Sequence, residues 1–285
     1  VRGAAGAVSE TTDLHRALGV FAEGDGVRFD LAEAALLLAA LDRPGVGPDR
    51  YRRLLDQLVM RTSQRLRTRD DAGAMDAIAA VNAVMFEEEG YSGDERTYDD
   101  LQNANLMRVM DRKCGLPVAL GILYIHAARG AGFQAAGLNF PGHFLVRIEA
   151  DGERLIVDPF NGGKLLRTPE LRNLLKALSG PGAELHPDHY RTVDDRQILL
   201  RLQNNVKLRL LQQGHIEAAL KIVQSMLAFA PDEWTLWREA GLMQARVGDI
   251  PSAISSLESY LLRVDTDDAR YRASVLLHEL RARLH

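Results

Sequence analysis

One uncharged stretch constrains the fold of this chain more than any other feature. Gly115-Leu116-Pro117 is followed by a run, 118–128, that contains no charged residue and a single histidine. Proline suits the first turn of a helix, because the N–H that it lacks would have no intrahelical partner there. The length of the run, and the glycines at 130 and 132 after it, predict a buried helix around which the rest of a domain packs.

Two strands joined by a tight turn are predicted shortly after this helix. The run 143–150 carries apolar residues at every second position, which is typical of a half-buried strand. Asp151-Gly152 is a strong hairpin signal, and 154–158 reads as the returning strand. A further strand is expected over 134–140, before Pro141-Gly142. A buried helix followed by an antiparallel hairpin predicts an α+β fold with a small antiparallel sheet.

The first ninety residues are predicted to be helical. From Asp30, which suits an N-cap, apolar residues recur at helical spacing as far as Leu41. A second amphipathic helix is expected around 51–59 and a third over about 72–89, and a short helix is expected over 103–112. The apolar positions of these helices indicate core packing, and no residue before position 90 suggests chemistry.

The tail contains an internal repeat. Gly214 and Gly248 are 34 residues apart, as are Ala219 and Ala253. A 34-residue period with small residues at these offsets is typical of tetratricopeptide repeats, in which small side chains let paired helices approach closely. The first unit is degenerate, because Lys207 stands where the second unit has Gly241. We therefore expect a helical tetratricopeptide-like region over 191–285, after a domain over 1–190.

Composition restricts the compartment and the class of partner. The 285 residues include 35 Lys and Arg against 39 Asp and Glu, a net charge of −4, with no block of like charge. This pattern argues against a nucleic-acid or anionic-membrane footprint. The single cysteine excludes an intrachain disulfide and fits a reducing compartment. Without a recognisable signal peptide or spanning segment, the chain is expected to be cytoplasmic, with a protein or peptide partner and no cofactor.

Three residues are candidates for chemistry: Cys114, His143 and Asp158. A thiol nucleophile needs a base, and the base needs a carboxylate or amide to orient its ring. Cys114 comes just before a predicted helix N-terminus, where the helix dipole favours a thiolate. His143 is predicted to open one strand of the hairpin and Asp158 to close the other. The two therefore fall roughly opposite each other, within a residue or two of register.

Each candidate also has a purely structural interpretation. A histidine after Pro141-Gly142 is often a partly buried residue with a backbone partner, and an aspartate before a proline often forms a turn. A single cysteine in an apolar segment is usually a small buried hydrophobe. The paired placement of His143 and Asp158 favours a real contact. A metal site that adds His126 is a third possibility, but the spacing matches no metal signature and His126 is better explained as a core histidine.

Five segments resemble the bacterial SirB-type proteins, which belong to the transglutaminase-like superfamily and carry tetratricopeptide-like helices after that domain. The segments are 86–93 (FEEEGYSG), 103–106 (NANL), 115–120 (GLPVAL), 140–147 (FPGHFLVR) and 157–160 (VDPF). The resemblance covers roughly residue 30 to the C-terminus. It implies a transglutaminase-like, papain-like core preceded by a helical N-terminal part.

The resemblance also implies roles for individual residues. In the superfamily the nucleophilic cysteine follows a glycine by two positions and begins the buried helix; matched on Gly115, that place holds Pro117. His143 and Asp158 match the family's histidine and aspartate. Cys114 sits three residues early, a shift of several ångströms along an extended chain, so the resemblance does not support it as the nucleophile.

Two functional hypotheses follow. The first is a non-catalytic transglutaminase-like module that binds a protein or peptide, with His143–Asp158 as a structural or binding pair. The second is a cysteine-dependent amidase, protease or acyl transferase in which Cys114 attacks a carbonyl carbon, His143 moves the proton and Asp158 orients His143. Backbone N–H groups near Leu116 would then stabilise the oxyanion. Proline at position 117, which offers no nucleophile, favours the first hypothesis.

Overall fold

The structure is a computed structural model that describes residues 12–22, 30–67 and 71–283. Its internal contacts divide the chain into two units, one of Phe29–Leu202 and one of Val1–Arg28 with Gln203–His285. The boundary falls within helix α8 (Asp195–Gln212). The expected division at 190/191 precedes α8, whereas this boundary falls inside that helix. No feature of the sequence predicts that the N-terminal residues group with the tail.

The larger unit begins with helices that match the sequence expectation closely. In α2, Asp30 caps the N-terminus because its carboxylate accepts hydrogen bonds from the backbone N–H groups of Ala32 and Glu33, at 3.1 and 3.0 Å. The third expected helix ends in a π-helix, Ala83–Glu88, and the helix expected over 103–112 is a 3₁₀ turn followed by α5, which Asn105 caps. The helices are α2 (Leu31–Leu41), α3 (Asp49–Leu66), α4 (Ala74–Asn82), α5 (Leu106–Arg112), α6 (Pro117–Gly130) and α7 (Thr168–Ser179).

The long uncharged run forms α6, which is the central helix of this unit. Pro117 occupies its first turn, and nearly all of its residues are buried. Gly121 lies so close to Phe144 that a Cβ atom there would overlap the ring. This close approach requires glycine at position 121 and fixes the segment that contains His143 against the helix.

The sheet is small and entirely antiparallel, as expected for an α+β fold. Its five strands run in the order β6-β5-β4-β3-β7. At the hairpin tip, Asp151 and Gly152 both have positive φ, 50° and 81°, which matches the right-handed twist of the paired strands. The strands are β3 (Gln134–Leu138), β4 (Val146–Ala150), β5 (Glu153–Asp158), β6 (Lys164–Leu166) and β7 (Thr192–Val193).

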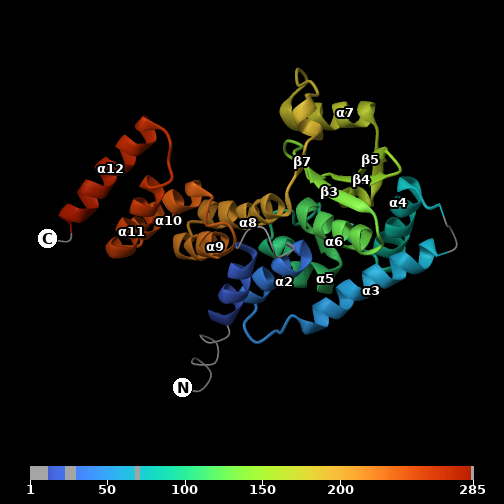
Figure 1. The fold of residues 1–285 in the computed structure, drawn as a ribbon, viewed down its shortest axis with the longest axis horizontal. Coiled ribbons are helices and arrows are strands. Elements are labelled where there is room, and N and C mark those ends of the chain that lie inside the picture. Colours follow the sequence, from blue (N-terminus) through green and yellow to red (C-terminus); the bar gives the residue numbers. More distant parts are fainter. Residues whose placement is uncertain (1–11, 23–29, 68–70, 284–285) are drawn as a thin grey trace. The chain divides into compact units, whose positions relative to one another are not determined.

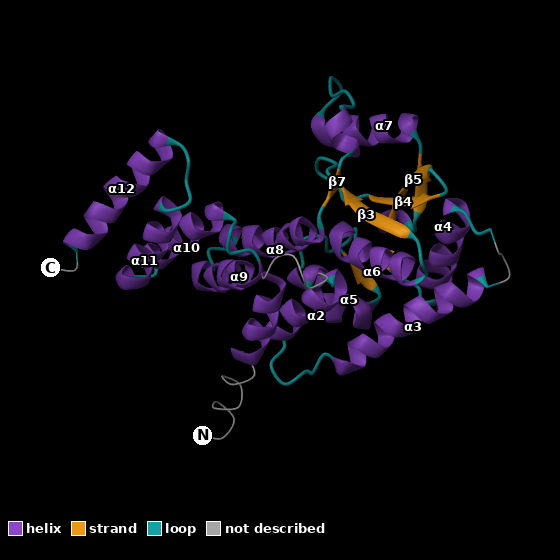
Figure 2. Ribbon diagram, in the orientation of Figure 1, coloured by secondary structure: helices purple, strands orange, loops and turns teal. Residues whose placement is uncertain are grey.

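Helices cover both faces of this sheet (Figures 1 and 2). Helices α4 and α6 pack against one face, where Val146, Ile148 and Val157 are fully buried. Helix α7 covers the other face, with Leu171 and Leu175 in one hydrophobic cluster with strand residues. The core of this unit is therefore a helix–sheet–helix sandwich.

The prediction that His143 opens a strand is wrong. Strand β4 begins at Val146, and His143 lies in the turn that follows Pro141-Gly142. Gly142 has φ +71°, a left-handed conformation that favours glycine and that reverses the chain before the strand. The histidine is thus presented by a turn rather than by a ladder position.

The smaller unit is helical and follows the expected 34-residue period. Helix α9 begins at Ile216 and α11 begins at Ile250, 34 residues later. The hydrogen bond from His215 N to Leu210 O recurs as Asp249 N to Gln244 O, so both helix ends close in the same way. The described elements are η1 (Val20–Ala22), α9 (Ile216–Phe229), α10 (Trp234–Arg246), α11 (Ile250–Leu261) and α12 (Asp267–Ala282).

Candidate functional site

The structure brings His143 and Asp158 into direct contact. The Nε2 atom of His143 lies 2.9 Å from Oδ1 of Asp158, and both side chains are buried. The ring of His143 also packs edge-on against Phe160, with centroids 5.9 Å apart. A carboxylate in this position fixes the orientation of the imidazole. The sequence-based expectation of a His–Asp contact therefore has the geometry it requires.

Asp158 has a second role, because it caps the 3₁₀ turn that follows β5. Its Oδ1 accepts from the backbone N–H groups of Phe160 and Asn161, at 3.0 and 3.4 Å. Its Oδ2 accepts from the Asn161 side-chain amide at 2.7 Å. Burial opposes ionisation of Asp158, but the hydrogen bond and charge of His143, together with the hydrogen bonds of Asn161, prevail and lower the pKa of Asp158 below its usual value. The carboxylate is thus held ionised and fully bonded.

Arg201, which sequence reasoning missed, holds the turn that carries His143. It lies in α8, and its Nη2 donates to the backbone carbonyl of His143 at 2.7 Å and to that of Phe140 at 3.3 Å. Its guanidinium also stacks over the ring of Phe144, 5.5 Å from the centroid. Burial lowers the pKa of Arg201. No local sequence signal marks this arginine, because the contact joins residues about sixty positions apart.

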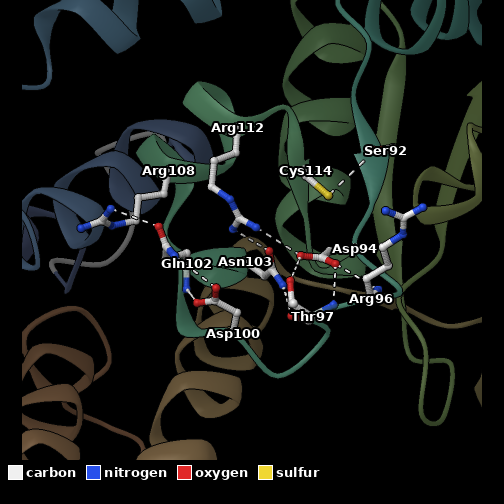
Figure 3. Close-up of polar contacts among 10 residues, drawn as sticks. All are labelled: Ser92, Asp94, Arg96, Thr97, Asp100, Gln102, Asn103, Arg108, Arg112 and Cys114. Carbon is white, nitrogen blue, oxygen red and sulfur yellow. Dashed lines mark hydrogen bonds and ion pairs between the residues drawn. The ribbon is translucent and has the colours of Figure 1, made fainter.

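Cys114 is placed differently from the expected nucleophile. It lies in a two-residue strand, β2 (Cys114–Gly115), that pairs in parallel with β1 (Ser92–Gly93). The hydroxyl of Ser92 donates to its sulfur at 3.8 Å (Figure 3). Among the residues that the structure describes, no hydrogen bond joins Cys114 to His143. The partly buried thiol is therefore engaged by a serine and not by the histidine.

A buried carboxylate, Asp94, holds the loop that pairs with Cys114. Asp94 accepts hydrogen bonds from the Thr97 hydroxyl at 2.5 Å and backbone N–H at 2.8 Å, and from Arg112 at 3.2 Å (Figure 3). These bonds, led by those of Thr97, lower the pKa of Asp94 to about 2. Arg112 also donates to Asn103, whose carbonyl oxygen accepts from Leu116 N just before α6. The network thus fixes the loop and the entrance to α6 together.

Pro117 stands at the first turn of α6, where the resemblance places the nucleophile. It is buried, and Leu116 precedes it in an extended conformation. Residues four apart lie on the same side of a helix, so Pro117 shares a side with Gly121, which contacts Phe144. That side of α6 faces the turn that carries His143.

The structure offers no support for a metal centre at these residues. Within the described ranges, no group of three or more His, Cys, Asp or Glu side chains is arranged to hold a metal ion. His126 lies within α6; burial lowers its pKa, and the charge of Asp30 and a hydrogen bond to the Leu55 backbone oppose that shift. None of the described helices combines the length and the apolar character needed to cross a membrane.

Comparison with known proteins gives matches over both parts of the chain. Residues 49–204 match a family described as the transglutaminase-like superfamily, and residues 206–283 match a tetratricopeptide repeat family. A UPF0162 protein of Xylella fastidiosa is 31% identical over 83% of this chain and 85% of its own length. A UPF0162 protein of Pseudomonas aeruginosa is 33% identical over 70% and 72%. Protein SirB1 of Salmonella typhimurium is 25% identical over 65% and 69%.

Proposed function

The chain belongs to the transglutaminase-like superfamily, and on that premise we propose that it is a non-catalytic member that acts as a protein-binding or regulatory module in the cytoplasm. The observation that carries this proposal is Pro117 in the first turn of α6. A proline ring offers no nucleophile and no ionisable group. The His143–Asp158 pair then serves to hold the turn and the segment after β5 in place, and its retention needs no catalytic explanation.

The placement of Cys114 supports the same reading. A nucleophilic thiol needs a base within hydrogen-bond reach, or one that a substrate brings within reach. The described hydrogen-bond partner of the sulfur is Ser92, whereas the Nε2 of His143 is directed at Asp158. Bonding of Nε2 to the carboxylate leaves Nδ1 available to a nucleophile, so it is the serine contact of Cys114, and not the orientation of His143, that supports the proposal.

The tetratricopeptide-like tail supplies the binding half of the proposal. Tetratricopeptide arrays commonly present helix faces to protein partners. On α12, Tyr271 and Val275 are one turn apart and 72% and 42% exposed, and Leu262 before it is 82% exposed. Exposed apolar side chains on one helix side suit a peptide or protein partner better than a nucleic acid.

An activity assay on the full chain tests the proposal. Purified protein is incubated with amide, ester and amine-acceptor substrates, next to Cys114→Ser and His143→Ala. We expect no turnover above the uncatalysed rate in any of the three. Turnover by the wild type that both substitutions abolish would instead establish the alternative, a Cys114–His143–Asp158 hydrolase or acyl transferase. Circular dichroism on each variant checks that a loss of activity is not a loss of fold.

A peptide selection tests the binding half separately. Peptides displayed on phage are selected against the full chain and re-tested against Tyr271→Ser and His143→Ala. We expect binding that the tail substitution weakens and the His143 substitution leaves unchanged. Peptides that need His143 and ignore Tyr271 would place recognition in the transglutaminase-like unit instead.

A further inference from the structure

A cavity of about 940 Å³ lies within the larger unit, on the side of the sheet that α7 covers. Its walls are formed by strands β4, β5 and β6, the starts of α4 and α7, and the segment 187–192. None of Cys114, Pro117, His143 and Asp158 lines it. Its volume is at the upper end of the range that binds small organic molecules. The proposed function makes no use of this space.

Four arginines line this cavity against one acidic residue. They are Arg147, Arg154, Arg167 and Arg191, and the acid is Glu153. The cavity thus gathers cationic side chains in a protein whose overall net charge is −4. Guanidinium groups match the geometry of carboxylate and phosphate oxygens, because two parallel N–H donors can bind two oxygens.

Arg147 is the fixed member of the four. Its side chain is 20% exposed, its Nη1 donates to the carbonyl of Tyr190 at 3.2 Å, and its Nη2 pairs with Glu149. The Nε of Arg147 is buried and has no hydrogen-bond partner within the described part of the chain. A guanidinium carries five N–H donors, so the protein leaves part of this group's capacity unused. Because this Nε is itself shielded from solvent, Arg147 contributes its positive charge to the cavity rather than a free donor.

The other three arginines are held weakly. Arg154 pairs with Glu149 at 3.4 Å and Arg191 with Asp188 at 3.3 Å, and their side chains are largely exposed. Exposed ion pairs of this kind contribute little to stability, so these side chains can turn toward a ligand at a small cost in free energy. Arg167 is exposed, and its side chain has no ion pair or hydrogen bond to any described residue. Arg167 is therefore the arginine most available to an incoming anion.

Apart from Thr168 and Thr192, the remaining lining residues are largely apolar. Ile156 and Leu166 of the sheet and Leu171 of α7 line the cavity, as does Tyr190. Leu166 and Leu171 belong to the hydrophobic cluster under α7, and Ile156 and Tyr190 pack against it. We propose that this cavity binds a small organic anion, in which the arginines hold a carboxylate or phosphate head and the apolar wall holds the body. The site is independent of the His143–Asp158 pair.

Titration of the ¹⁵N-labelled full chain with phenyl phosphate and with benzoate tests the proposal. We expect saturable shifts of cavity residues, with benzyl alcohol, the uncharged counterpart, binding at least ~10-fold more weakly. The anion with the higher affinity identifies the preferred head group. The affinity of phenyl phosphate relative to inorganic phosphate measures the contribution of the apolar wall. Absence of saturable binding by both anions up to about 10 mM, or equal binding of benzyl alcohol, would overturn the proposal.

Two substitutions and a matched control locate the binding. Arg167→Gln removes a charge that has no partner in the fold and should weaken the bound anion by about 3- to 10-fold. Thr168→Trp, at an exposed cavity residue, should block the site without altering charge. Arg53→Gln removes an equally exposed arginine of α3 outside the cavity and should leave the affinity unchanged. Equal weakening by Arg53→Gln and Arg167→Gln would reduce the effect to general charge and contradict the assignment.

Discussion

His143 reaches Asp158 although the two residues are not partners in the sheet. The last ladder pair at that end is Val146 with Val157, so Asp158 stands beside position 145. The turn at Gly142, with φ +71°, brings the imidazole back over the end of β5, where Nε2 meets Oδ1 at 2.9 Å.

Asp158 should matter more to stability than His143. Asp158→Ala removes the acceptor of two backbone N–H groups, the Asn161 amide and the His143 ring, and should cost about 2–4 kcal/mol of unfolding free energy. His143→Ala removes one of these bonds and should cost about 1–2 kcal/mol. Urea denaturation followed by circular dichroism measures both. Asp151→Asn, at the exposed hairpin tip, serves as the control, and equal losses at 143 and 158 would contradict the assigned capping role.

Asp94 should make stability sensitive to acid. Its folded pKa is about 2, below the unfolded value of about 3.9, because Thr97 and its other partners stabilise the ionised form. The resulting stability is fully present above the unfolded pKa and is lost as pH falls from about 4 to about 2. Asp94→Asn should therefore be about 1–3 kcal/mol less stable than the wild type near pH 7, with a gap that narrows toward about pH 2.5. Urea titrations across this range measure the gap, and a constant difference would show that the charge is not responsible.

A thiol at position 117 should be reactive. In a Cys114→Ser background, Pro117→Cys places the thiol at the N-terminus of α6, on the side that faces the turn of His143. The helix dipole favours thiolate, and an imidazole within reach can accept the proton of the thiol. Alkylation by iodoacetamide at about pH 6.5 should run about tenfold faster than with free cysteine, and His143→Ala should remove most of the gain. If the engineered thiol is alkylated no faster than free cysteine, position 117 does not face the His143–Asp158 pair.

Gly121 should be irreplaceable despite its poor helix propensity. Gly121→Ala adds a methyl that overlaps the Phe144 ring and should destabilise by about 1–3 kcal/mol, more than the gain in propensity. Gly19→Ala is the matched control, because a Cβ there meets nothing within 4 Å and the residue is also helical. That change should be neutral or stabilising by up to about 1 kcal/mol. Thermal unfolding compares the two, and a stabilised Gly121→Ala would show that α6 and the turn are looser than described.

Local signals in the sequence predicted most of the fold. Asp30 and Pro117 begin helices as their side chains predict, and Asp151-Gly152 forms the turn that its φ requirements favour. The 34-residue period reproduces the same helix-end hydrogen bonds in both repeats. In each case the information lies within a few residues of the feature, or repeats at a fixed interval.

The parts that were missed depend on distant contacts. The β1–β2 pair that places Cys114 joins segments about twenty residues apart, and each strand is too short to show a pattern. Arg201 reads as one more polar residue of α8 until its contact with the His143 carbonyl is known. The capping role of Asp158 could have been found, because aspartate followed by proline is a recognised helix-start signal.

The double duty of Asp158 has a consequence for descent. If a branch of this family no longer needs a catalytic triad, the histidine and the aspartate are not equally free to be substituted. Replacing the histidine removes its one hydrogen bond to Asp158. Replacing the aspartate removes the hydrogen bonds that cap the turn after β5 and exposes a buried strand end. Such a branch would lose its histidine first and keep its aspartate. An aspartate at this position is therefore weak evidence that a protein is an enzyme.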